Sequence, residues 1–188
     1  MITKSMIRKE MIARRSGLDE TARERYSGCI CNRILSSCAY KTAGTVFAYA
    51  PFGSEADVMP IVLQALKDHK TVAFPRCEEK GVMRFYAIAS EDDLVQGRYG
   101  IREPKQGCRD VEVKNGLMLV PMTAFTPQLD RLGYGGGYYD RYVGESPFVT
   151  YAGVAFSTQM TDFIPVEEHD KRPDIIITEK TEYRKTNV

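Results

Sequence analysis

Short apolar segments that end at proline, separated by amphipathic helical stretches, are the feature that most limits how this chain can fold. The segments 45–51 (TVFAYAP), 71–75 (TVAFP) and 117–121 (LMLVP) are rich in β-branched, aromatic or aliphatic residues, as buried strands are. Each ends at a residue that has no N–H to donate to a strand ladder. Strands of this kind, alternating with helices, indicate an α/β fold with a mostly parallel sheet.

The same pattern continues along the chain and completes this prediction. We expect further strands over 82–88, 148–156 and 174–178, helices over 3–15, 19–37 and 58–68, a helical turn over 91–94, a long loop over 97–116 and a helix that begins near Gly137. The sequence contains no internal repeat and no low-complexity linker. It therefore predicts one domain over 1–188, a single three-layer α/β/α domain that is Rossmann-like, with helices on both faces of the sheet.

The carboxyl ends of the predicted strands are where we expect a ligand. In parallel α/β sheets, ligands bind in the crevice beyond those ends. The segments 48–55, 74–79, 119–140 and 155–159 follow or close the predicted strands. The sequence therefore predicts a binding site made from these four segments.

The composition is that of an ordinary globular protein, with 43% hydrophobic residues, 27% charged residues and a net charge of +1. This balance excludes a disordered chain, a fibrous repeat and a strongly cationic nucleic-acid-binding protein. The best apolar run, 46–52, is far shorter than the roughly 18 residues of a membrane span. We expect small-molecule substrates, no nucleic-acid or membrane partner, and a monomer or weak dimer.

The five cysteines favour a reducing compartment, because their number is odd and no Cys-x-x-Cys pair is present. We therefore expect a cytoplasmic protein without a disulfide framework or a zinc site. Cys29 and Cys38 fall in a helical stretch, and we expect them to be small core residues.

The first 33 residues form a locally basic segment, with eight basic and four acidic side chains. Lys4, Arg8 and Arg15 fall on one face of the predicted helix, at spacings of four and seven. A basic segment on a nearly neutral protein indicates a small anionic ligand rather than a polyanion. The alternative is an ordinary solvated helix face.

The stretch DRLGYGGGYYDR (130–141) carries the most chemical information. Four of the five residues 133–137 are glycine: Gly133, Gly135, Gly136 and Gly137. This segment is called the glycine loop (133–137). Such a loop is costly to order unless it needs positive φ angles or a close approach to a ligand. Where it leads into a helix, its amide groups and the helix end favour an anion, usually phosphate. Tyr138 replaces the last glycine of a dinucleotide fingerprint, and no Gly-Lys-Ser/Thr is present.

Side chains around the glycine loop suit a nucleotide. Arg131 offers a fixed positive fork to a phosphate. Tyr134, Tyr138 and Tyr139 offer flat faces and hydroxyl groups to an aromatic ligand. Asp140 could hold a magnesium ion that bridges phosphates. The alternative is a structural glycine-rich turn in which Asp140 only caps a helix.

Four blocks of the sequence, taken in order, resemble the 5-formyltetrahydrofolate cyclo-ligase family. KSMIR (4–8) resembles the family's Lys-x-x-x-Arg, and AYAPFGSEAD (48–57) resembles its block with a glutamate after the first strand. RLGYGGGYYDR (131–141) resembles the signature loop and is the most specific of the four. AFSTQMTDFIPVEEHDKRPDIIITE (155–179) resembles the C-terminal block, so the resemblance spans nearly the whole chain.

The resemblance implies a three-layer α/β/α fold, a reaction and a set of site residues. The reaction converts 5-formyltetrahydrofolate and ATP, with Mg²⁺, to 5,10-methenyltetrahydrofolate, ADP and phosphate. The implied ATP-binding residues are Lys4, Ser5, Met6, Ile7, Arg8, Arg131, Leu132, Gly133, Tyr134, Gly135, Gly136, Gly137, Tyr138 and Tyr139. The implied substrate-binding residues are Ala50, Glu55, Tyr134, Gly135, Gly136, Gly137 and Tyr138, and the implied metal ligands are Asp140 and Asp170. Arg131 and Tyr138 are the catalytic candidates.

The implied reaction needs assistance because the formyl group is amide-like and its oxygen is a poor leaving group. Phosphorylation of that oxygen turns it into phosphate, and nitrogen-10 of the folate can then close the ring. Such a transfer requires cations, a metal ion and backbone amides around the phosphoryl group. Those parts are available in Lys4, Arg8, Arg131, Asp140 and the glycine loop.

One departure from the family pattern leaves other functions open. Some family members carry Gly-Lys-Gly where this chain has three glycines, so the loop lacks a lysine charge at Gly136. A non-catalytic folate- or nucleotide-binding protein of the same fold would bind ligands without releasing ADP. A small-molecule kinase would use the same loop and leave a phosphorylated product.

Overall fold

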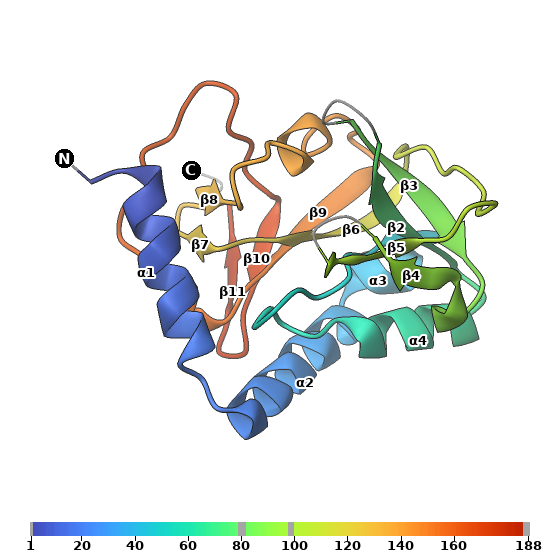
Figure 1. Cartoon of the computed structure of the whole chain (residues 1–188), viewed down its shortest axis with the longest axis horizontal. Helices are drawn as coiled ribbons and strands as arrows, with labels where there is room; N and C mark the ends of the chain where they lie inside the picture. The colour runs from blue at the N-terminus through green and yellow to red at the C-terminus, as the bar shows by residue number, and fades with distance from the viewer. Residues whose placement is uncertain (1, 79–81, 98–99, 186–188) are drawn as a thin grey trace.

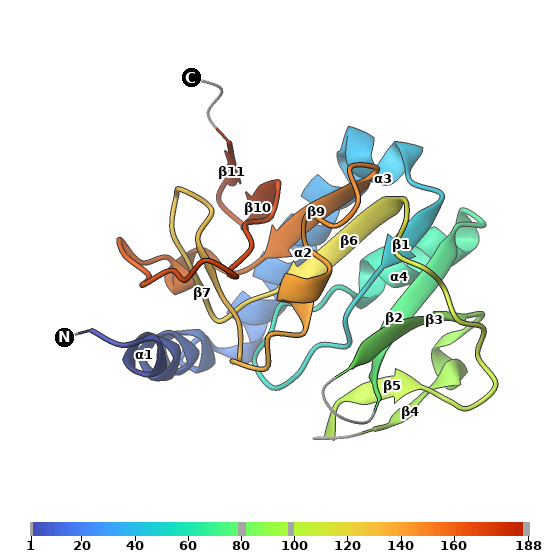
Figure 2. The same ribbon diagram turned by 90° about the horizontal axis from the view of Figure 1, so that it is seen from above.

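A mixed β-sheet forms the centre of the protein in the computed structural model, which describes residues 2–78, 82–97 and 100–185 (Figure 1). Within these residues the sheet has seven strands in the order β11-β10-β9-β6-β1-β2-β3. They are β1 Thr45–Phe47, β2 Thr71–Cys77, β3 Met83–Ile88, β6 Gly116–Pro121, β9 Val149–Val154, β10 Ile175–Ile177 and β11 Glu182–Arg184. Strands β10 to β2 are parallel, and β11 and β3 are antiparallel edges (Figure 2). The expected α/β fold with a mostly parallel sheet is confirmed.

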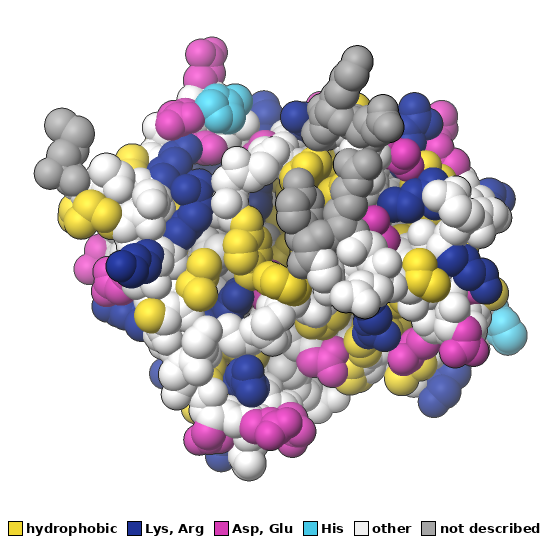
Figure 3. Space-filling model, in the orientation of Figure 1, with side chains coloured by type: hydrophobic (Ala, Val, Ile, Leu, Met, Phe, Trp, Pro, Cys, Tyr) yellow, Lys and Arg dark blue, Asp and Glu magenta, His cyan; other side chains and the backbone are white. Residues whose placement is uncertain are grey.

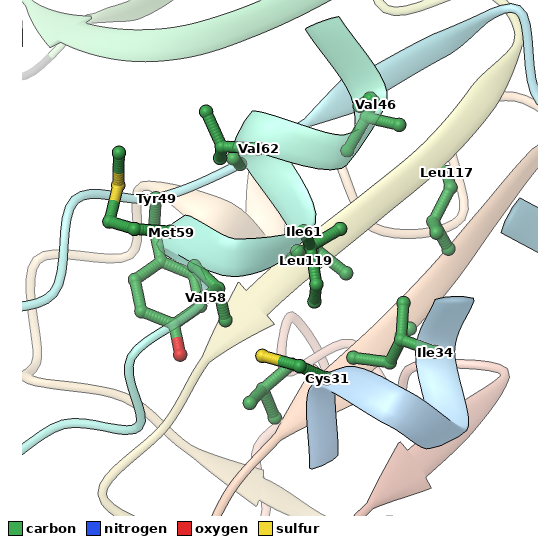
Figure 4. Packing of buried hydrophobic residues seen from close by; sticks show 14 of the residues in the cluster. Cys31, Ile34, Val46, Tyr49, Val58, Met59, Ile61, Val62, Leu117 and Leu119 are labelled. Atoms are coloured by element: carbon green, nitrogen blue, oxygen red, sulfur yellow. The ribbon is translucent and has the colours of Figure 1, made fainter. Parts of the chain in front are cut away.

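Three helices cover one face of this sheet and lie below it in Figure 1: α2 (Glu20–Ser36), α3 (Cys38–Thr42) and α4 (Met59–Lys67). The side chain of Asp19 accepts a hydrogen bond from the Ala22 amide at 2.7 Å and caps α2, as the sequence predicts. Figure 4 shows the resulting contact, in which α2 and α4 pack on strand β6. Ile34, Ile61 and Leu119 are fully buried there.

The cysteine prediction was wrong, since Cys29 and Cys38 are exposed. The buried face of α2 consists of Ser27, Ile30, Cys31 and Ile34, which recur every three or four residues. Cys29 lies outside that stripe, and Cys31 takes the core position instead.

The other face of the sheet carries no long helix among the described residues. The helix expected near Gly137 is a single 3₁₀ turn, η4 (Tyr139–Arg141), which lies above the sheet in Figure 1. The chain turns at Gly144, where φ is +81°, so the helix does not continue. Aromatic rings fill the space under η4: Phe47 and Phe85 have centroids 5.2 Å apart, and Tyr142 lies edge-on to Phe85.

Two short antiparallel pairs lie outside the main sheet: β4 (Leu94–Gln96) with β5 (Arg102–Pro104), and β7 (Ala124–Phe125) with β8 (Arg131–Leu132). The loop expected over 97–116 was therefore partly wrong, because β5 forms within it by pairing with β4. Residues 98–99 of that prediction, and Glu79 of the predicted binding segments, lie outside the described residues.

The first helix, α1 (Lys4–Ser16), stands apart from the α2–α4 layer. Its buried residues Ile7 and Met11 pack against Ala124, Leu132 and Ile164, so α1 sits on the β7–β8 hairpin. It also contacts η5 (Ser157–Gln159). Within the described residues, no helix combines the length and apolar character that crossing a bilayer requires.

Candidate active site

The sheet reverses its strand order at β1, and this reversal opens a cavity. From β1 the chain continues to β2 and β3 on one side, whereas β6, β9 and β10 extend the sheet on the other. Connections that leave in opposite directions create a crevice at the carboxyl ends of the strands. A cavity of about 710 Å³ lies there, lined by Tyr49 and Ala50 after β1, by Pro75 of β2 and by Pro121 of β6. The cavity therefore lies where the strand pattern predicts it, but the prediction was wrong for the fourth segment, because residues 155–159 do not line the cavity.

The whole glycine loop lines this cavity, together with Arg131, Leu132, Tyr138, Tyr139 and Asp140. Gly135 and Gly137 have φ angles of +103° and +64°, which side-chain-bearing residues rarely adopt. A Cβ atom at Gly136 would lie 2.6 Å from the ring of Tyr138. Glycine is thus required for the backbone path and for the close approach of Tyr138.

Arg131 brings a buried positive charge to the cavity from β8. Its side chain is only 3% exposed and donates to Oδ1 of Asp140 at 2.5 Å. The Nε–H of the same guanidinium is buried and has no hydrogen-bond partner in the described part of the chain. An unpaired buried donor is costly, so this geometry favours a ligand oxygen beside Arg131.

Helix α1 supplies two further cations to the same cavity. Nζ of Lys4 lies 2.6 Å from Oδ2 of Asp170 and 3.4 Å from Oε1 of Glu167. Nε of Arg8 donates to the carbonyl oxygen of Gly133 at 2.7 Å. Figure 3 shows dark blue Lys and Arg side chains gathered over α1. The helix therefore places a basic wall beside the glycine loop.

The residues between these two cations do not line the cavity. Ser5 and Met6 are exposed, and Ile7 is buried against the β7–β8 hairpin. Positions 4 and 8 share a helix face, and the three intervening positions turn away from it. Of the ATP-binding residues expected on α1, the structure brings Lys4 and Arg8 to the cavity.

Glu55 lies in a second wall of the cavity, where its nearly buried side chain pairs with Arg15. The sequence predicts Arg15 on the basic face of the first helix but does not predict this pairing. The Glu55 carboxylate, 6% exposed, accepts from the Phe52 amide at 2.9 Å and lies 3.9 Å from Nη1 of Arg15. Arg15 also donates to the Tyr134 hydroxyl at 2.7 Å and to Oγ of Ser54 at 3.0 Å. Arg15 therefore joins α1 to Glu55 and to the glycine loop.

The charge state of Glu55 depends on a balance between burial and these contacts. Burial raises the pKa of Glu55 above its usual value. The Phe52 amide, the Arg15 guanidinium and the Tyr134 hydroxyl each lower that pKa and offset part of the rise. Arg15 is thus the cation that stabilises the ionised form.

Replacing Arg15 with methionine is expected to destabilise the protein in a pH-dependent way. Loss of the cation leaves Glu55 buried without its charge partner, so the free energy of unfolding at pH 8 should fall by about 3 kcal/mol. The pKa of Glu55 rises further in the folded variant, so folding favours protonation. The loss is therefore smaller at pH 5, where Glu55 is more protonated in both folded proteins, and it grows as the pH rises through the raised pKa of Glu55 in the wild-type protein toward the still higher pKa in the variant. Urea unfolding at both pH values measures it.

Arg14→Met is the matched control, because Arg14 is the neighbouring exposed residue of α1 and pairs with Glu10 at 2.6 Å. Its effect should stay within about 0.5 kcal/mol at both pH values. An equal loss at pH 5 and pH 8 for Arg15→Met would show that Arg15 does not stabilise the ionised Glu55.

Comparison with known proteins agrees with this geometry. A family model described as the 5-formyltetrahydrofolate cyclo-ligase family matches residues 1–179. The chain belongs to this family. The 5-formyltetrahydrofolate cyclo-ligase of Escherichia coli K12 is 29% identical over an alignment of 171 residues that covers 88% of this chain and 94% of that protein. The mouse 5-formyltetrahydrofolate cyclo-ligase is 24% identical and is aligned over 92% of each chain.

A solved structure of a related enzyme has the same fold. The NMR structure of 5,10-methenyltetrahydrofolate synthetase from Aquifex aeolicus superposes with a TM-score of 0.85 at 31% identity. The superposition covers 97% of this chain and 93% of that one. The family match and this similarity both extend over nearly the full length of the chain.

The two carboxylates expected as metal ligands in this family member both line the cavity. Oδ1 of Asp140 pairs with Arg131, and Oδ2 of Asp170 pairs with Lys4. Burial raises the pKa of Asp170, but the Lys4 ammonium and the Glu167 amide outweigh burial and hold it below its usual range. No cluster of three or more potential metal-ligating side chains occurs among the described residues. Two carboxylates fit Mg²⁺, which commonly takes its other ligands from water and phosphate.

Proposed function

We propose that this chain converts 5-formyltetrahydrofolate and ATP to 5,10-methenyltetrahydrofolate, ADP and phosphate, with Mg²⁺. The observation that carries the proposal is the buried, unpartnered Nε–H of Arg131 beside the glycine loop, in one cavity with the buried carboxylate of Glu55. The first feature suits a phosphate and the second suits the N–H groups of a pterin. Membership of the 5-formyltetrahydrofolate cyclo-ligase family supports the same pair of ligands.

The reaction proceeds in two substitutions. The formyl oxygen attacks the γ-phosphorus of ATP, and the bond from that phosphorus to ADP breaks. Nitrogen-10 then attacks the formyl carbon, the carbon–oxygen bond breaks, phosphate leaves with the electron pair and nitrogen-10 loses its proton. The protein has to align the formyl oxygen with the γ-phosphate and to neutralise the transferred group.

Three cations of this chain are placed to neutralise the phosphates. Arg131 presents its unpartnered Nε–H, Lys4 reaches the cavity from the first turn of α1, and Arg8 is held at the glycine loop by the Gly133 carbonyl. These charges take the place of the lysine that some family members carry at the position of Gly136. The amide groups of the glycine loop then position the phosphate oxygens without further side chains.

We assign the tyrosines within and directly after the glycine loop to the region between the two proposed reactants. Tyr138 packs its ring over Gly136 and lines the cavity, so we assign it to contact with both the nucleotide and the folate. Tyr134, held by Arg15, faces the Glu55 wall. Burial raises the pKa of Tyr139, which therefore stays a neutral hydroxyl group. We assign the folate to the wall formed by Ala50 and Glu55.

Asp140 and Asp170 would hold the Mg²⁺ ion, which when bound neutralises phosphate charge. We expect Asp140→Asn to raise the Mg²⁺ concentration needed for half-maximal activity by about tenfold, because one anionic ligand is lost. A Mg²⁺ titration of steady-state activity measures this shift. Asp130→Asn is the control, since Asp130 pairs with Arg172 and does not line the cavity. An unchanged titration for Asp140→Asn would remove Asp140 from the metal site.

One assay tests the proposed function directly. Purified protein is mixed with ATP, Mg²⁺ and 5-formyltetrahydrofolate, and the absorbance of the methenyl product is followed beside a sample without ATP. Product formed only with ATP, together with one ADP per turnover, is the expected result. Ligand binding without ADP release would identify a non-catalytic binding protein, and a stable phosphorylated product would identify a kinase.

A further inference from the structure

One carboxylate at the cavity has no cationic partner among the described residues. The acidic side chains that line the cavity are Glu55, Glu103, Asp140, Glu167 and Asp170. Four of them lie within 3.9 Å of a nitrogen atom of Arg15, Arg131 or Lys4. In the part of the chain that the structure describes, Glu103 alone makes no ion pair. This difference singles out Glu103 as an acceptor without a protein cation.

The position of Glu103 is fixed by its surroundings. It belongs to β5 and is 8% exposed, and among the described residues it accepts only from the Cys77 amide, at a long 3.4 Å. A Cβ atom at position 97 would lie 2.6 Å from the Glu103 carboxyl group, so Gly97 makes room for it. The apolar side chains of Met83 and Ile101 line the same cavity.

A carboxylate in this position favours a ligand that donates hydrogen bonds to it. Burial of an ionised group without a partner is costly, and one long hydrogen bond compensates little of that cost. Phosphate would be repelled there, and the cations that suit phosphate lie on α1 and β8. Figures 1 and 2 both place α1 and β5 on opposite sides of the molecule. The Glu103 wall therefore belongs to the folate rather than to the phosphates.

We propose that Glu103 binds the pterin of 5-formyltetrahydrofolate, accepting hydrogen bonds from the 2-amino group and from N3–H. These adjacent donors match the two oxygens of a carboxylate. Adenine offers one amino group beside an acceptor nitrogen and matches less well. The proposal rests on the proposed function, and it gives the cavity a second folate-binding carboxylate besides Glu55, whose own oxygens already receive hydrogen bonds.

The test compares 5-formyltetrahydrofolate with its 2-desamino-2-methyl analogue, which lacks the amino donor. Calorimetry on the wild-type protein should show that the natural compound binds about 10- to 100-fold more tightly. In Glu103→Ala this preference should fall to about onefold, while affinity for ADP with Mg²⁺ stays unchanged. A structural defect alone would weaken both folates equally and leave their ratio intact.

Two further variants make the outcome decisive. Glu103→Gln keeps an acceptor for the Cys77 amide, so it protects the fold if the alanine variant unfolds, and its preference should also collapse. Glu78→Gln is the control, because Glu78 pairs with Arg76 outside the cavity and should keep the wild-type ratio. A wild-type ratio in folded Glu103→Ala or Glu103→Gln would overturn this proposal. A wild-type protein that binds neither folate would instead overturn the proposed function.

Discussion

Replacing Arg131 with alanine is expected to lower kcat/KM for ATP by about 1,000-fold, the scale of a lost arginine at a transferred phosphoryl group. The guanidinium is almost fully buried, and its Nε–H is the one buried side-chain donor without a partner in the described part of the chain. The variant also leaves Asp140 without its nearest cation. Steady-state kinetics at varied ATP measures the loss, and thermal unfolding checks that the fold persists.

Arg172→Ala is the matched control for that experiment. Arg172 is also an arginine paired with an aspartate, at 2.6 Å from Asp130, but it does not line the cavity. Its kcat/KM for ATP should stay within about twofold of the wild-type value, as for a surface substitution away from the site. A normal rate and a normal KM for ATP in Arg131→Ala would remove Arg131 from the active site.

Replacing Glu55 with glutamine is expected to weaken binding of 5-formyltetrahydrofolate by about 100-fold, because a charged acceptor in a nearly buried wall is lost. Glutamine keeps the size of the side chain and can still accept from the Phe52 amide. It loses the negative charge that Arg15 balances. Calorimetry with the folate measures the change, and affinity for ADP with Mg²⁺ should stay at the wild-type value.

Glu10→Gln is the control for Glu55→Gln. Glu10 is likewise a glutamate paired with an arginine, Arg14, but both side chains are exposed on α1. Its folate affinity should be unchanged. Wild-type affinity in Glu55→Gln would refute the assignment of Glu55 to the folate wall.

Local sequence patterns were sufficient to predict most of the fold. The segments 45–51, 71–75 and 117–121 contain or become β1, β2 and β6, and the Asp19 cap became the start of α2, because strand and helix preferences act over a few residues. Proline ends only β6 of these three strands, since β1 ends at Phe47 and β2 continues past Pro75 to Cys77. The short helix α3, the η4 turn, the pairs β4–β5 and β7–β8 and the edge strand β11 were not predicted. Whether the chain pairs 102–104 with 94–96 depends on contacts that no local pattern encodes. The helix expected near Gly137 stays a single turn because the chain turns at Gly144.

The candidate site was predicted in part for a similar reason. The glycine loop is a local signal, and Lys4 and Arg8 share a helix face, so the sequence predicts both as a phosphate site. Arg15 was seen on that face without a partner, and Glu103 gave no signal. The role of each residue depends on which side chains the fold brings next to it. Arg15, for example, donates a hydrogen bond to Tyr134, which lies 119 residues later in the sequence.

The sequence by itself determined the main strands and helices, the glycine loop and the family, because these reside in short-range periodicity and in motifs of fixed spacing. Only the tertiary structure decided which cation meets which carboxylate. Lys4 pairs with Asp170, Arg131 with Asp140 and Arg15 with Glu55, while Glu103 stays without a cation in the described residues. With 26 basic and 25 acidic residues, many pairings satisfy the same sequence. Strand order and burial select among them, because a charge pair forms only where the fold brings both groups within a few ångströms.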